Sequence, residues 1–190
     1  LLPGDGQSRV LTSQMKGVIG FSLDAEVTIL ILWPTQEWKR WVAYTVSHEY
    51  IHLVRNLLLP RNIVGSKLIY QKSQEPETLL DAMVAEGIAD AFASELYTDM
   101  EPPWTRALTP ETTEQIWPKV RRRLHVSDTT EIRRFLFGDN DRIPVWTGYT
   151  IGYRVVRGYL ARPPTAKPAN LLGLSGKTIL EASNYPPGLA

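Results

Sequence analysis

The chain has 190 residues, 43% hydrophobic and 22% charged, which is typical of a soluble globular protein and excludes disordered, collagen-like and coiled-coil chains. Its 21 Lys and Arg against 20 Asp and Glu leave a net charge of +1, so no global electrostatic attraction to nucleic acid or anionic membranes is expected. Without Cys, the chain has no disulfides and no thiolate metal site. Because a domain typically has about 150 residues, we expect a single domain over 1–190, with sub-lobes at 1–100 and 101–190 as a further division.

The sequence shows neither a signal peptide nor a membrane-spanning segment. The longest uncharged apolar run, residues 27–33, is far shorter than the roughly 20 residues that a membrane helix needs. We therefore expect a soluble protein, with the cytoplasm slightly favoured as its compartment. Because the chain opens on Leu1 and not on Met, targeting information could have been lost with that start. The sequence does not indicate an oligomeric state.

The first third of the chain predicts a β-hairpin followed by a long helix. Segments 17–21 and 27–33 are apolar and rich in β-branched residues, and the polar residues between them have turn character. The period then changes to that of a helix. Thr35 is a suitable N-cap for a helix over 36–58, which Pro60 stops.

The rest of the chain predicts helices and loops. A loop over 61–75 leads to a second helix, which Pro76 can start and which runs to about residue 97. Further helices are expected from Thr109-Pro110 (kinked or split at Pro118), over 129–137, over 147–162 and as a short turn or helix within 171–183. The expected fold is α+β and mostly helical, with a small antiparallel sheet before the first long helix.

The first long helix contains the motif His48-Glu49-Tyr50-Ile51-His52, an HExxH. Imidazoles at i and i+4 lie about 40° apart around a helix, so His48 and His52 can reach one metal ion. Glu49 points roughly 60° away from His52, which lets it hold a metal-bound water without being a ligand. Zinc suits such ligands, and a catalytic zinc site takes three protein ligands and a water. The alternative is a buried helix that carries two histidines by chance.

A third ligand must come from elsewhere in the chain. A metzincin layout is excluded because its Gly and His positions hold Arg55 and Leu58. His125 follows a run of arginines, whose charge disfavours a dication. Glu86 is the better candidate, since it lies mid-helix among small and apolar residues, where an unpaired carboxylate would be costly. Asp90 lies one turn further on the same face and can accept the outer N–H of a zinc-bound imidazole. A solvated helix face is the alternative for both acids.

The small residues beside Glu86 also predict how closely two helices pack. Ala85, Gly87 and Ala89 leave little side-chain bulk on this helix. We therefore expect the second helix to approach the first one closely at these positions.

An HExxH followed on a later helix by ExxxD resembles the gluzincin metalloproteases. More closely, TVSHEYIHLVR followed by LLDAMVAEGIADAFA is similar to a bacterial family of predicted zinc-dependent proteases of unknown function. The resemblance extends over most of the chain. It implies a zincin-like fold with zinc bound by His48, His52 and Glu86. It also implies that Glu49 is the general base and that Asp90 supports a ligand histidine.

A second resemblance concerns the helix over 147–162. Tyr149 and Tyr153 share one face of it, and the intervening glycines permit close packing. This pattern resembles the YxxG helix of several gluzincin groups, in which the tyrosine donates to the transition-state oxyanion. The resemblance implies Tyr149 as the donor, with Tyr153 second. The alternative is that both are core aromatics with one polar end. Arg55 could orient a carboxylate or simply be exposed.

The sequence thus predicts zinc-dependent hydrolysis of peptide bonds in a peptide or protein substrate. We expect strand 27–32 to lie at the sheet edge and pair with an extended peptide. Most of the six tryptophans are expected in the core, although Trp33 and Trp146 could line a cleft. The Gly-Met-Glu-Asn type motif of the large aminopeptidases is absent, which favours an endopeptidase. Two alternatives stay open: a non-catalytic zinc-binding module that binds a partner, which the intact Glu49 disfavours, and a metallohydrolase of a non-peptide amide.

Overall fold

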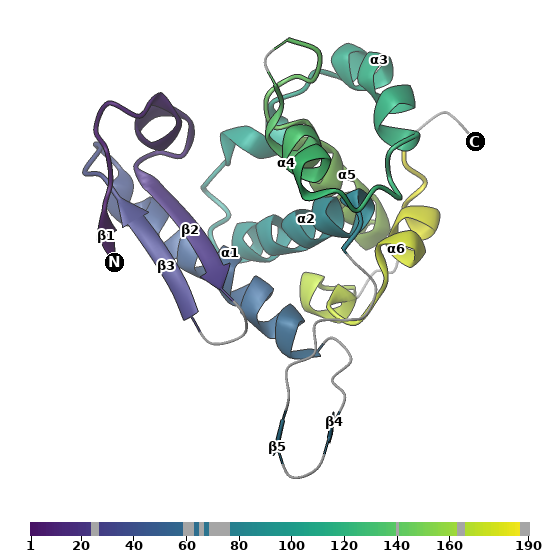
Figure 1. Cartoon of the computed structure of the whole chain (residues 1–190), viewed down its shortest axis with the longest axis horizontal. Coiled ribbons are helices and arrows are strands. Elements are labelled where there is room, and N and C mark those ends of the chain that lie inside the picture. Colours follow the sequence, from purple (N-terminus) through teal and green to yellow (C-terminus); the bar gives the residue numbers. More distant parts are fainter. Residues whose placement is uncertain are drawn as a thin grey trace.

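The computed structural model describes residues 1–23, 27–58, 63–64, 67–68, 77–139, 141–162 and 166–186. It confirms a mostly helical α+β fold with a small sheet (Figure 1). The helices are α1 (Trp38–Leu58), α2 (Leu79–Leu96), α3 (Pro110–Arg121), α4 (Thr129–Phe137), α5 (Thr147–Leu160) and α6 (Gly176–Ser183). The strands are β1 (Leu2–Pro3), β2 (Val18–Leu23), β3 (Val27–Leu32), β4 (Ile63–Val64) and β5 (Lys67–Leu68). Short helical turns lie at Val10–Gln14, Pro103–Arg106 and Pro168–Leu171.

The sheet has the strand order β1-β3-β2 and is mixed. β2 and β3 form the predicted antiparallel pair, with Val18 opposite Leu32. β1 adds a parallel strand, with Leu2 opposite Ile31. The prediction that β3 is the edge strand is therefore wrong at Ile31 and Leu32, which lie between two partners, whereas residues 27–30 pair with β2 alone among the described strands. Within the described residues β1 and β2 are the two edge strands, and β2 packs on α1.

The helices begin and end close to the predicted residues, with two differences. α2 begins at Leu79, where Thr78 and Asp81 form a reciprocal capping box. The predicted start at Pro76 lies outside the described residues, as does most of the predicted loop over 61–75. α3 is capped by Thr109 as predicted, but it runs through Pro118 to Arg121 and is not split.

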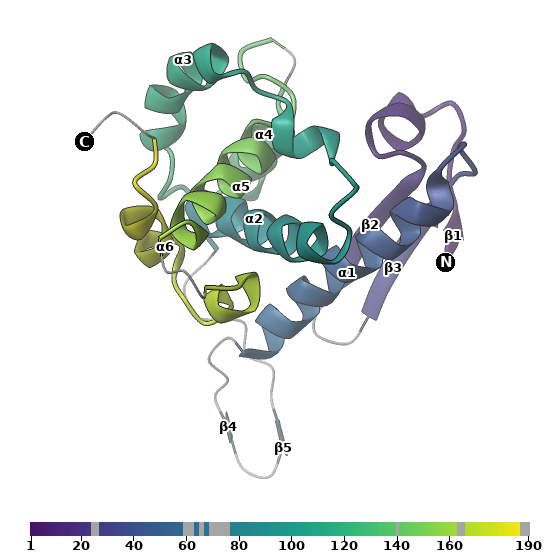
Figure 2. The same ribbon diagram turned by 180° about the vertical axis from the view of Figure 1, so that it is seen from behind.

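The helices pack in a sequence that starts at the sheet. α1 lies between the sheet and α2, and α5 packs on α2 in turn (Figures 1 and 2). The α2–α5 contact depends on two glycines. A Cβ at Gly152 would lie 1.9 Å from the carbonyl oxygen of Met83, and a Cβ at Gly87 would lie 2.4 Å from the carbonyl oxygen of Gly152. Gly87 thus brings α2 close to α5, and the prediction that it serves an approach to α1 is wrong.

The buried core joins these helices into one cluster. Ile88 and Val84 of α2 are fully buried, as are Ile151 and Val156 of α5. None of the described helices combines the length and the apolar character that crossing a membrane requires.

Candidate metal centre

Two helices bring three ligand atoms together. His48 and His52 come from α1 and Glu86 from α2. The Nε2 atoms of the two imidazoles are 3.0 Å apart, and Glu86 Oε2 lies 3.1 Å from His48 Nε2 and 3.6 Å from His52 Nε2. In a tetrahedral site with bonds of about 2.0–2.1 Å, neighbouring ligand atoms are about 3.3 Å apart. The three atoms therefore form a triangle of the size that one zinc ion requires.

The charges at this triangle favour a cation. Burial opposes the charged form of His48, but the carboxylates of Asp90 and Glu86 raise its pKa well above the usual value. Burial would also raise the pKa of Glu86, yet His52 and His48 lower it well below its usual range. Two imidazole nitrogens and one carboxylate oxygen are also a ligand set of catalytic zinc sites. The residues present thus fit a zinc ion in both geometry and charge.

Asp90 holds the outer edge of the His48 ring. Its carboxylate is fully buried, and Oδ1 lies 3.1 Å from His48 Nδ1. Since a carboxylate only accepts, Nδ1 donates to Asp90, and this contact turns Nε2 toward His52 and Glu86, where a metal ion would take the place of a proton. Asp90 also accepts from the Tyr44 hydroxyl at 3.0 Å, and the Trp104 indole N–H lies 3.0 Å from both of its oxygens. A network of donors therefore compensates the burial of this charge.

Glu49 lies outside the ligand triangle and faces the sheet. Its side chain is buried, and its carboxylate accepts a hydrogen bond from the Ser22 hydroxyl of β2 at 2.7 Å. Gly20, two residues earlier on β2, leaves room for it, because a Cβ there would lie 2.5 Å from Glu49 Cγ. The Glu49 side chain is thus packed between its own helix, α1, and strand β2.

Tyr149 of α5 is buried close to the acids of the centre. Burial raises the pKa of its hydroxyl well above the usual value, and the charges of Glu86, Asp90 and Glu49 raise it further. Its ring contacts Trp146, with the centroids 5.2 Å apart. The hydroxyl is therefore neutral and surrounded by the acids of the centre.

A family described as "Predicted Zn-dependent protease (DUF2268)" matches residues 1–181. The chain belongs to this family. A curated relative, "Uncharacterized protein YjfC" of Bacillus subtilis (strain 168), is 30% identical over 90 residues, which cover 42% of this chain and 30% of that protein. The chain thus spans less than a third of the length of that relative. No solved structure matches the chain.

Membership of this family of predicted Zn-dependent proteases confirms the resemblance noted in the sequence. Its description supports zinc as the cofactor and a protease as the general kind of function. The cluster of His48, His52 and Glu86 is where the described part of the chain could hold the ion.

The other residues considered from the sequence lie apart from this cluster. Arg55 is buried and donates to the carbonyl of Leu172, which ties α1 to the segment before α6, so it is not exposed. Burial lowers the pKa of Arg55. His125 is exposed and does not belong to the cluster. Trp33 is 41% exposed, and its ring lies against Gly6 of the N-terminal segment.

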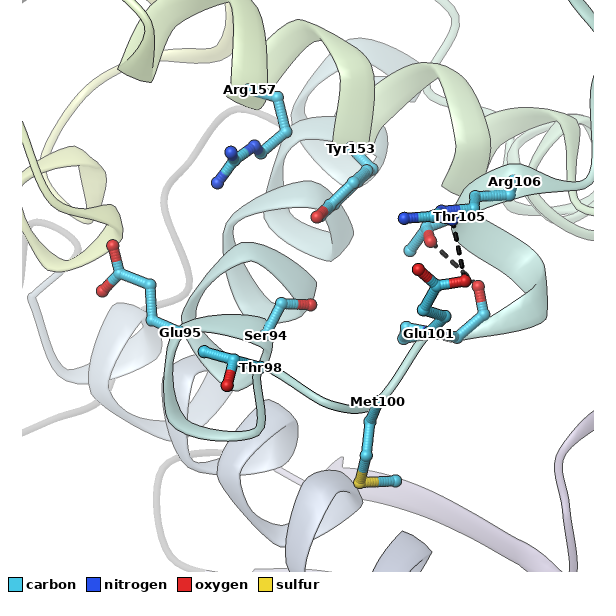
Figure 3. Close-up of a pocket in the computed structure, with 10 residues that line it drawn as sticks. Ser94, Glu95, Thr98, Met100, Glu101, Thr105, Arg106, Tyr153 and Arg157 are labelled. Carbon is cyan, nitrogen blue, oxygen red and sulfur yellow. Dashed lines mark hydrogen bonds and ion pairs between the residues drawn. The ribbon is translucent and has the colours of Figure 1, made fainter.

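A separate pocket of about 370 Å³ opens further along α2 and α5. Tyr153 lines it together with Ser94 and Arg157, and Figure 3 shows the Tyr153 hydroxyl directed into it. None of the three ligand residues lines this pocket. Ser94 connects this pocket to the centre, because its hydroxyl lies 3.3 Å from that of Tyr44, which donates to Asp90.

Sequence patterns did not point to Ser22, Tyr44 or Trp104. Tyr44 lies four residues before His48 on α1, so helical spacing alone could have placed it on the ligand face. Ser22 and Trp104 come from a strand and a short turn, and no spacing along the chain connects them to the acids that they contact.

Proposed function

We propose that this protein is a zinc-dependent endopeptidase whose metal ligands are His48, His52 and Glu86. The observation that carries the proposal is the triangle of two imidazole nitrogens and one carboxylate oxygen, with edges of 3.0, 3.1 and 3.6 Å. The acid that follows the first histidine supports an enzyme over a binding module, because a purely structural site has no need of a base.

Bound at this site, zinc supplies a Lewis acid for the scissile carbonyl and lowers the pKa of water toward about 7. Glu49 takes a proton from the attacking water, whose oxygen forms a bond with the carbonyl carbon. As the carbon–nitrogen bond breaks, Glu49 returns this proton to the leaving amine. The neutral hydroxyl of Tyr149 donates a hydrogen bond to the carbonyl oxygen as that oxygen becomes negative. Asp90 keeps the His48 ring in one tautomer.

The substrate would bind as an added strand along β2. This strand lies at the sheet edge of the described residues, and Gly20 and Ser22 bring it into contact with Glu49. An extended peptide that pairs with β2 through main-chain hydrogen bonds would therefore pass beside the general base.

The decisive experiment compares the wild type with Glu49→Gln, both loaded with zinc. The amide is nearly isosteric but a poor base, so zinc content should stay at one ion per chain while peptide cleavage falls by more than the roughly 10²–10⁴-fold typical of general-base removal. Zinc is measured by atomic absorption and cleavage with a diverse library of quenched fluorescent peptides.

Each failure of this experiment would have a distinct meaning. A zinc-loaded wild type that cleaves no peptide would move the assignment to a partner-binding module or to a hydrolase of a non-peptide amide. Full activity of Glu49→Gln would refute the assigned base.

A further inference from the structure

The edge strand contributes a side chain to the general base. Ser22 of β2 places its hydroxyl 2.7 Å from Glu49 Oε2 and 3.1 Å from the Glu49 carbonyl oxygen. A distance of this length is short enough for a charge-assisted hydrogen bond between a hydroxyl and a carboxylate. The Thr28 hydroxyl of β3 lies 3.3 Å from that of Ser22, which anchors the serine from the other side.

Glu49 has little freedom to lie elsewhere. It is 6% exposed, and its carboxylate rests on the backbone of Gly20, where a Cβ would lie 2.6 Å from Oε1. The carboxylate is therefore confined between α1 and β2. Ser22 is the side chain of β2 that contacts it, and Gly20 provides the space.

We propose that Ser22 is a positioning residue, which fixes the Glu49 carboxylate in the orientation needed for proton transfer. This inference rests on the proposed role of Glu49 as the base. Because Ser22 donates to Oε2, the proton that Glu49 takes from water resides on Oε1 and returns from Oε1 to the leaving amine. The strand that pairs with the peptide thus also orients the base, so that substrate and base share one rigid support.

The first test measures turnover in the zinc-loaded full chain. Ser22→Ala should lower kcat between about 10-fold and 100-fold, the range for losing a hydrogen bond to a charged group, and should change KM less than about twofold. Ser22→Thr keeps the hydroxyl and should recover most of the loss. Ser183→Ala is the matched control, because it removes a buried hydroxyl that donates to a backbone carbonyl within α6. It should leave kcat unchanged.

The second test does not depend on turnover. Acetohydroxamate chelates zinc and can share its proton with a carboxylate beside the metal, so its affinity reports where Glu49 lies. In calorimetric titrations, Ser22→Ala should weaken acetohydroxamate about tenfold, Glu49→Gln should weaken it at least as much, and the zinc dissociation constant should stay the same in all three proteins.

These outcomes separate the inference from the proposed function. If the wild type cleaves no peptide, the proposed function fails, while the acetohydroxamate comparison still decides the role of Ser22. Ser22→Ala that equals the wild type in both assays overturns the inference, as does a loss confined to zinc binding or thermal stability. If Ser22→Ala does not fold, Ser22→Cys is measured in its place. The thiol has nearly the volume of the hydroxyl but is a weak hydrogen-bond donor, so the reduced variant should show the same losses of turnover and acetohydroxamate affinity.

Discussion

Replacing Asp90 by Asn tests how the buried acid supports the metal ligands. The variant keeps the volume of the side chain and removes its charge. The Trp104 N–H lies 3.0 Å from both carboxylate oxygens, so an amide nitrogen faces this donor in either orientation. The orientation with the nitrogen at Oδ2 is the less costly one, because Oδ1 is shared with His48 and Tyr44. His48 then keeps an acceptor, but a neutral one.

The expected loss follows from this change of acceptor. A hydrogen bond to a charged group contributes about 1.5–3 kcal/mol and a neutral one about 0.5–1.5 kcal/mol, so the contact with the His48 ring weakens by about 1–1.5 kcal/mol. Since 1.4 kcal/mol corresponds to a factor of ten, the zinc dissociation constant should rise about tenfold. This lies at the lower end of the 10–100-fold range typical of groups that support a metal-bound histidine.

The assay is a competition titration of zinc against a chromogenic chelator, on protein shown to be folded by circular dichroism. Trp104→Phe is the control, because it removes one donor to Asp90 but keeps the charge and the Asp90–His48 contact, so zinc should weaken less than in Asp90→Asn. A folded Asp90→Asn protein that binds zinc as tightly as the wild type would show that Asp90 does not support the ligand set.

Three further changes test other parts of the structure. Tyr149→Phe should retain zinc and lower turnover about 10²–10³-fold in a peptide assay, whereas Tyr153→Phe should have a smaller effect; a larger loss in the second variant would mean that the wrong tyrosine is assigned. Gly152→Ala should lower the free energy of unfolding by about 1–3 kcal/mol or more in urea titrations, because its Cβ would lie 1.9 Å from a backbone oxygen of α2, whereas Gly173→Ala, with nothing within 4 Å, should be neutral. Backbone N–H donors and an arginine lower the pKa of Asp139, so its carboxylate stabilises the fold above the usual pKa of about 3.9 and this contribution is lost as the pH falls. The stability difference between wild type and Asp139→Asn, followed by thermal unfolding, should therefore shrink between about pH 5 and pH 2.

Local signals explain why much of the helical fold could be predicted. The helix over 129–137 is bounded by an Asp N-cap and by Gly138, whose φ of +84° is accessible to glycine, and both ends agree with the prediction. The HExxH spacing and the unusual apolar setting of Glu86 are also local properties. They were sufficient to predict the cluster at which α1 and α2 meet.

Contacts between distant segments explain the errors. β1 has only two residues and no alternating pattern, yet its pairing with Ile31 and Leu32 makes β3 the central strand of the sheet. The face that Gly87 presents to α5 depends on how three helices are arranged, which periodicity does not reveal. The contacts of Trp104 with Asp90 and of Ser22 with Glu49 join positions that share no spacing, so only the folded chain brings them together.

The division of the ligands between α1 and α2 couples zinc affinity to folding. Glu86 lies 38 residues from His48 along the chain, so an unfolded chain does not hold these atoms within 4.8 Å of one another. An ion that binds only the native state stabilises it by about 2.7 kcal/mol when its free concentration is 100 times the dissociation constant. The midpoint of thermal unfolding should then rise with free zinc and fall with chelator. A melting temperature of this protein therefore has a defined meaning only together with the free zinc concentration at which it is measured.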